Sequence, residues 1–164
     1  MRAALLVAVS LAALAAAGVA PGSGLATACS SASARAAIAA SKPRLALTGP
    51  KQPIAPSMAD KVLCFDVTGD GHGDMAVTLF SGGTAGDVGW LLFAWNGTRW
   101  QLVATGSGYK LGLFRSGSKL LAVQPVYRTN DPNCCPTGGF DRTLYRWDGS
   151  RLVVARSWHT KTFR

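Results

Sequence analysis

Two segments of the chain share one pattern, and this pattern constrains the fold more than any other feature of the sequence. They are "LFAWNGTRWQLV" (92–103) and "LYRWDGSRLVVA" (144–155). Each is centred on Asn-Gly or Asp-Gly, dipeptides that close tight β-hairpins because both tolerate positive φ. Leu92 aligns with Leu144 and Trp95 with Trp147, which predicts an internal repeat of about 50 residues, each unit closed by an aromatic hairpin. The alternative is that the pattern is only what good hairpins require.

Short β-rich runs bounded by turn residues recur through the same region, and no long helix is predicted after residue 60. The runs are 75–80, 90–95, 99–104, 119–127, 142–147 and 151–158, with weaker ones at 61–65 and 109–114. They predict an all-β fold over residues 60–164: a small antiparallel domain of about 6–8 strands, blade-like as in a propeller or a sandwich. The repeat units would cover 60–107 and 108–164.

The N-terminal region reads as an export signal followed by a tether. Residues 1–28 begin with Arg2 and continue as an uncharged Ala/Leu/Val run, the layout of a signal peptide. Residues 29–59 are rich in Ala, Ser and Pro, and we expect a flexible tether there, with a short helix over 34–40 as the alternative. In "LATACSS" the small residues before Cys29 resemble a lipobox, so Cys29 is a candidate lipidation site. Cleavage after Ala28 or after Ala34 is the alternative.

The four cysteines are Cys29, Cys64, Cys134 and Cys135. Export favours disulfides. We expect Cys64 to pair with Cys134 or Cys135, on the assumption that Cys29 is lipidated or removed. Two other arrangements stay open: a Cys134–Cys135 bridge that leaves Cys64 free, and two bridges if Cys29 is retained without a lipid.

Three of the eight acidic residues of this basic chain fall within "DVTGDGHGD" (66–74), although the net charge is +9. Like charges this close repel one another, so a cation is the obvious partner. Calcium takes oxygen ligands at alternate loop positions, with glycine where the chain bends. The predicted ligands are the side chains of Asp66, Thr68, Asp70 and Asp74 and the carbonyl of His72. The alternative is an Asp/Gly-rich turn with solvated carboxylates.

This loop, followed by an apolar strand, resembles the calcium loop of FG-GAP and VCBS-type repeats, which form the blades of integrin α-subunit propellers. Loop positions are counted from Asp66 as position one. The resemblance implies a Ca²⁺ site closed by the Asp at position nine, here Asp74, and such a site needs no glutamate at position twelve. Thr68 departs from the Asn or Asp usual at position three, which implies weaker binding. A second resemblance is weaker: "PVYRTNDPNCCPTGGFDRTLYRWDGSRL" (125–152) is similar to actinobacterial secreted lipoproteins of the LppP/LprE type, which implies an envelope location.

The remaining motifs argue against catalysis and against nucleic acid. There is no G-x-S-x-G or H-E-x-x-H motif, and no Glu anywhere in the chain. The basic residues are spread without a dense run, so anionic envelope polymers, lipid headgroups or another envelope protein are more natural partners than nucleic acid. We expect a basic outer face at the second hairpin, formed by Arg128, Arg142, Arg146 and Arg151.

The sequence therefore predicts an extracytoplasmic calcium-binding β module of the bacterial envelope, secreted or anchored to the membrane only through a lipid on Cys29. Its role would be binding or structural, and not enzymatic. The alternative is a secreted enzyme or thiol-redox protein that uses Cys134 and Cys135.

Overall fold

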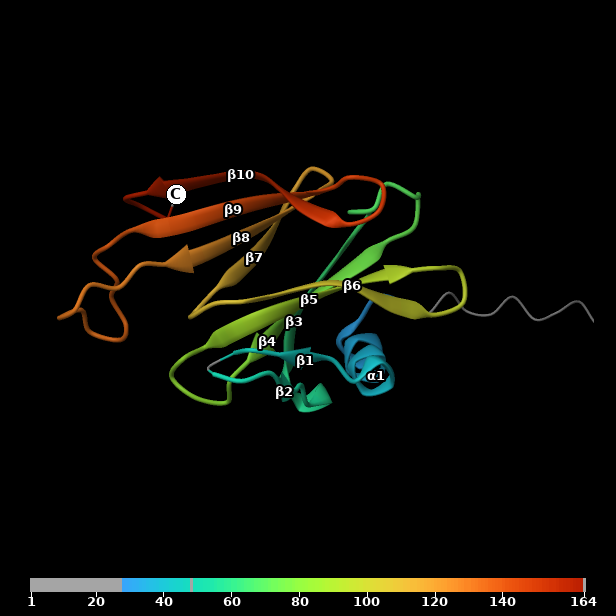
Figure 1. The fold of residues 1–164 in the computed structure, drawn as a ribbon, viewed down its shortest axis with the longest axis horizontal. Helices are drawn as coiled ribbons and strands as arrows, with labels where there is room; N and C mark the ends of the chain where they lie inside the picture. Colours follow the sequence, from blue (N-terminus) through green and yellow to red (C-terminus); the bar gives the residue numbers. More distant parts are fainter. Residues whose placement is uncertain (1–27, 48, 164) are drawn as a thin grey trace, which may run out of the picture.

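The computed structural model describes residues 28–47 and 49–163, so the predicted signal peptide lies almost wholly outside the described residues. Within these described residues, one α-helix, one 3₁₀ turn and ten strands follow one another (Figure 1). Their bounds are α1 Ser31–Ser41, β1 Arg44–Leu45, β2 Gln52–Pro53, η1 Pro56–Met58, β3 Ala59–Phe65, β4 Asp74–Phe80, β5 Asp87–Trp95, β6 Trp100–Ser107, β7 Gly112–Ser116, β8 Lys119–Pro125, β9 Phe140–Trp147 and β10 Leu152–Thr160.

Two four-stranded antiparallel sheets make up most of the molecule, which confirms the all-β prediction. The first sheet has the order β3-β4-β5-β6 and the second β10-β9-β8-β7, so each is a meander in which sequential strands are neighbours. A third sheet pairs only β1 with β2. Each predicted repeat unit contains one of the two meanders, and the sheets face each other (Figure 1).

The first sheet is buried on both faces. On one face α1 and the β1–β2 pair pack against Met75, Val77, Leu91 and Phe93. On the other face Ala76, Trp90 and Leu92 meet the second sheet, with the Trp90 ring 5.4 Å from the Tyr145 ring. Both faces of β4 and β5 therefore need apolar side chains, which explains why these strands read as nearly continuous apolar runs without alternation.

The segment predicted as a flexible tether is ordered and forms part of the core, so that prediction is wrong. Ser30 caps α1 by accepting the Ser33 amide, and the helix ends at Lys42, which has φ 47°. Ala34, Ala37 and Ile38 lie at helical spacing and are buried against the first sheet. The Ala-rich composition that suggested a tether instead gives a slim helix that can approach a sheet closely.

The two predicted hairpins have the same turn chemistry. The Asn96 side chain accepts the amides of Thr98 and Arg99 and the Thr98 hydroxyl. Asp148 accepts the equivalent groups of Ser150 and Arg151. The hairpins differ in the direction of their aromatic side chains. Phe93 of the first hairpin is buried on the helix side, whereas Tyr145 of the second packs between the sheets.

Candidate functional site

The acidic loop connects β3 to β4, and its glycines shape it. Gly69 and Gly71 have φ of 78° and 83°, which L-residues with a side chain rarely adopt. Asp66 accepts the amides of both glycines, one on each carboxylate oxygen. Asp70 accepts the amide of His72 at 2.8 Å. The loop therefore holds two of its carboxylates in fixed positions with its own N–H groups.

Asp74, the third acid of the loop, is directed inward. It is fully buried at the start of β4, and its Oδ2 accepts the amides of Val67 and Thr68, both at 2.7 Å. The Thr68 hydroxyl lies 3.4 Å from the other oxygen. Burial raises the pKa of Asp74 because it removes water from the charged form, while the amides of Thr68 and Val67 act in the opposite direction.

These contacts test the predicted calcium ligands against the geometry. Asp66 and Asp70 are oriented at the surface of the loop and fit the expected role. Asp74 does not, because its side chain is fully buried, whereas those of Asp66 and Asp70 reach the surface. Among residues 28–47 and 49–163, no three His, Cys, Asp or Glu side chains are gathered as a metal site. Calcium binding at this loop therefore stays a prediction.

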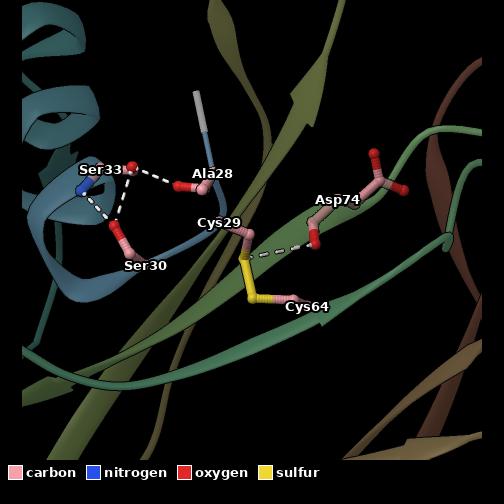
Figure 2. Close-up of a disulfide and its surroundings, with 6 residues drawn as sticks. All are labelled: Ala28, Cys29, Ser30, Ser33, Cys64 and Asp74. Carbon is pink, nitrogen blue, oxygen red and sulfur yellow. Dashed lines mark hydrogen bonds between the residues drawn. A yellow bond between two sulfur atoms is a disulfide. The ribbon is translucent and has the colours of Figure 1, made fainter. Parts of the chain in front are cut away.

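The cysteines form two disulfides, and the predicted pairing of Cys64 is wrong. Cys64 of β3 bonds to Cys29, just before α1 (Figure 2). Cys134 bonds to its neighbour Cys135. The long bridge was expected because Cys29 was assumed to be lost or lipidated. A thioether-linked lipid would need the same Cys29 sulfur, so lipidation and this disulfide exclude each other.

The Cys29–Cys64 bridge lies beside the acidic loop. Figure 2 shows the Cys29 sulfur against the backbone carbonyl of Asp74, at 4.0 Å, while the Asp74 carboxylate points away from the bridge. Closing a loop across a sequence separation of 35 stabilises the fold by about 4 kcal/mol in the chain-entropy account. The bridge thus ties the start of α1 to the edge strand that leads into the loop.

The four arginines of the predicted basic face lie on different segments of the second sheet and its loops. Arg142 and Arg146 share a face of β9, Arg151 follows the second hairpin turn, and Arg128 belongs to the 126–139 loop. Arg142 is half-buried and used inside the molecule: it donates to the Thr160 hydroxyl and the Phe163 carbonyl. Arg151 lies 3.5 Å from Asp148. Arg146 and Arg128 are exposed.

Sequence reasoning missed how the 126–139 loop is held. Asn133 is its anchor: its side chain accepts from the Tyr109 hydroxyl, and its carbonyl accepts from Tyr127 and Lys110. The rings of Tyr109 and Tyr127 meet edge to face at 5.5 Å. The exposed Cys134–Cys135 bridge follows directly. The signal present in the sequence was Asn133 beside two cysteines, but two of its partners, Tyr109 and Lys110, lie on the connection between the two sheets.

Comparison with protein-family models, curated proteins and solved structures gave no match. The resemblances to FG-GAP or VCBS-type loops and to LppP/LprE-type lipoproteins therefore stay predictions. No helix among the described residues has the length and apolar character that crossing a bilayer requires.

Proposed function

We propose that the chain is an exported β module of the bacterial cell envelope that acts by binding, with a calcium-responsive loop beside its N-terminal bridge. The observation that carries this proposal is the Cys29–Cys64 disulfide. Disulfides form and persist in oxidising compartments and are rare in the cytosol. A bridge that joins the segment before α1 to the core sheet therefore supports export.

The bridge also supports one of the maturation routes over the others. Cleavage after Ala28 leaves Cys29 as the first residue and keeps the disulfide. Cleavage after Ala34 removes both Cys29 and the Ser30 cap of α1. Free secretion after cleavage at Ala28 keeps the disulfide and the Ser30 cap, and of these contacts it loses only the bond from the Ser33 hydroxyl to the Ala28 carbonyl.

Export is tested by expressing the full chain with its own leader and separating cytoplasm, membrane and medium. We expect mature protein that starts at Cys29, carries the mass deficit of two disulfides and lacks a lipid. Protein retained in the cytoplasm with free thiols would contradict export. A diacylglycerol adduct would support export and reject the proposed route.

Calcium binding rests on Asp66, Asp70 and the His72 carbonyl, because Asp74 is fully buried. With so few ligands we place the dissociation constant at about 1 mM, the weak end of extracellular sites. At about 2 mM calcium this stabilises the fold by about 0.65 kcal/mol, or about 2 °C in Tm.

The calcium test is thermal unfolding in calcium and in chelator. Asp70→Ala should abolish the calcium-dependent shift, and Asp60→Ala, an exposed acid outside the loop, serves as the matched control. An equal shift in Asp70→Ala and the native chain, or no shift in the native chain, would reject the site.

The binding partner we propose is anionic envelope material. Net charge supports it: 17 basic residues stand against 8 acidic ones. Binding through charge should fade between low and physiological salt, as the Debye length falls from about 30 Å at 0.01 M to about 8 Å at 0.15 M. Co-sedimentation with anionic and neutral vesicles measures this.

The structure alters which arginines should be changed in that assay. Arg142 has internal partners, so its loss would disturb the fold as well as the surface. Arg146→Ser with Arg151→Ser removes exposed charge instead. Equal binding to both vesicle types, or binding unaffected by salt, would reject charge-driven binding. It would mean that the basic residues are only solvated surface groups.

A second candidate function, thiol–disulfide exchange, is favoured by the exposure of both Cys134 and Cys135. Exchange requires a thiolate to reach a sulfur, and here both sulfurs belong to exposed residues. Reduced protein would then pass electrons to a disulfide substrate such as oxidised glutathione and end as the Cys134–Cys135 disulfide. Turnover lost in Cys134→Ser would support it, while the same slow exchange in both chains would reject it.

A further inference from the structure

A basic pocket lies where the 126–139 loop meets the end of β10. Its volume is about 340 Å³. Its lining residues are Arg128, Thr137, Gly138, Gly139, His159 and Lys161. The lining holds one guanidinium, one ammonium and one imidazole, and none of its side chains is acidic. We propose that this pocket binds a phosphate group, which deepens the proposed binding function by giving it a defined site and ligand chemistry.

The loop side of the pocket is built by Asp131. Its Oδ2 accepts the amides of Arg128 and Thr137 at 2.8 and 2.7 Å, and its Oδ1 accepts the Thr137 hydroxyl at 2.7 Å. These bonds fold the two rims of the loop together and hold the pKa of Asp131 below its usual value. The carboxylate is thus engaged by the loop, while the Arg128 side chain is exposed on the rim.

The strand side of the pocket is built by His159. Its Nδ1 lies 2.9 Å from Asp141 Oδ1 on the neighbouring strand β9, which fixes the ring orientation. The other ring nitrogen, Nε2, lies over Gly139, where an added Cβ would come within 2.7 Å of it. Gly139 also has φ 87°. Glycine at 139 is therefore what lets the imidazole lie close against the loop backbone.

Lys161, in the C-terminal tail, supplies the remaining charged side chain of the pocket. Hydrogen bonds fix the path of the tail on both sides of this residue. The Thr160 hydroxyl receives Arg142 Nε at 3.0 Å and donates to the Thr162 carbonyl at 2.9 Å. Arg142 also donates to the Phe163 carbonyl, and the Phe163 ring packs on Phe140 at 5.3 Å between centroids. The half-buried Arg142 thus positions the exposed Lys161 at the pocket.

This donor set matches phosphate chemistry. A guanidinium presents a planar fork of N–H groups that pairs with phosphate oxygens, and an ammonium adds a point charge. The imidazole directs its Nδ1–H at the Asp141 carboxylate, so its Nε2 can accept a hydrogen bond from a phosphate hydroxyl. The nearby acids Asp131 and Asp141 reduce the net charge but are already hydrogen-bonded to loop amides and to His159. The pocket therefore suits a single phosphate better than an extended polyanion.

The test follows the amide and His159 ring resonances of the full mature chain by NMR during titration with inorganic phosphate at constant ionic strength. We expect saturable shifts confined to residues around the pocket. Arg128→Gln with Lys161→Gln should weaken binding by about tenfold or more, because two charge-assisted contacts are lost. The matched control removes two exposed charges elsewhere, Arg35→Gln with Lys119→Gln, and should bind as the native chain does.

Lys161→Gln alone keeps the test available if the double variant fails to fold, since Lys161 is exposed near the chain end. Absence of a saturable shift would overturn the proposal. Equal weakening in the control pair would also overturn it, because it would reduce the effect to overall charge.

Vesicle binding distinguishes the two possible sources of the phosphate group, a lipid headgroup and a soluble phosphate compound. Vesicles with phosphatidic acid carry a terminal phosphate, and phosphatidylcholine vesicles with oleate can be matched to them in charge. Preference for phosphatidic acid that free phosphate abolishes supports a lipid headgroup as the source. Saturable phosphate binding without that preference supports a soluble phosphate compound.

The experiments distinguish the absence of a phosphate site from the absence of any anion binding by the module. Without a phosphate site, salt-dependent binding to both anionic vesicle types would persist through Arg146 and Arg151. If the module does not bind anions at all, that binding disappears as well, while the disulfide test of export is unaffected by either result.

Discussion

Asp74 has a different role in the structure from the one that the sequence motif predicts. Motif spacing assigns it to a cation, yet its carboxylate lies in the interior and accepts two backbone amides. Buried amides without partners are costly, so an acceptor at this position stabilises the loop whether or not a metal is bound.

Asp74→Ala should therefore lower the free energy of unfolding by about 2–4 kcal/mol in chelator, because it leaves the amides of Val67 and Thr68 without an acceptor. Asp74→Asn keeps one acceptor oxygen and should lose less. Asp70→Ala, at an exposed position, should change stability by less than about 0.5 kcal/mol. Urea unfolding measures all three. Similar losses at positions 70 and 74 would show that Asp74 has no special structural role.

The paired turns at Asn96 and Asp148 allow a matched pH experiment. The amides of Arg151 and Ser150 and the Ser150 hydroxyl hold the pKa of Asp148 at about 2, below its ordinary 3.8. A pKa depressed by folding contributes stability above the unfolded pKa and loses it as pH falls through the folded one. The native chain should therefore lose stability between about pH 4 and pH 2 partly through Asp148.

Asp148→Asn should flatten that loss, because asparagine accepts the same amides without titrating, as Asn96 already does. Asn96→Asp should steepen it by adding a second titrating turn. Unfolding free energy measured from pH 5 to pH 2 in the three chains provides the comparison. Parallel curves would contradict the assigned role of these turn bonds.

At the scale of elements, α1 decides how the first sheet is covered. Ile38 is fully buried against the sheet, whereas Arg35 on the same helix is exposed. Ile38→Ala should cost about 2–4 kcal/mol through lost apolar burial and a residual cavity. Arg35→Ala should be nearly neutral. A neutral Ile38→Ala in thermal or urea unfolding would mean that residues 29–59 are a tether after all.

The elements that the sequence predicted are those with strong local signals. Both hairpin turns and the all-β character follow from turn dipeptides and short β-rich runs. Helix α1 was mistaken for a tether because its apolar residues are mostly alanine, which bury little area and give a weak amphipathic pattern. Its assignment depends on the sheet face it covers, and that information is not local.

At the scale of the whole molecule, three connections tie the layers together. The Cys29–Cys64 bridge joins α1 to the first sheet, the Trp90–Tyr145 contact joins the two sheets, and Asn133 joins the long loop of the second sheet to the connection that leaves the first. The acidic loop could be recognised as a candidate site from the sequence because its residues are contiguous. The basic pocket was not, since Arg128, His159 and Lys161 meet only after the second sheet has formed.

We have proposed an exported module whose N-terminal segment is bridged to its core sheet. The decisive measurement is peptide mapping without reduction, on protein recovered from the medium or periplasm. We predict one linked pair that contains Cys29 and Cys64 and a single peptide that carries the Cys134–Cys135 bridge. Cys64 linked to Cys134 or Cys135, or Cys29 carrying a lipid, would contradict it.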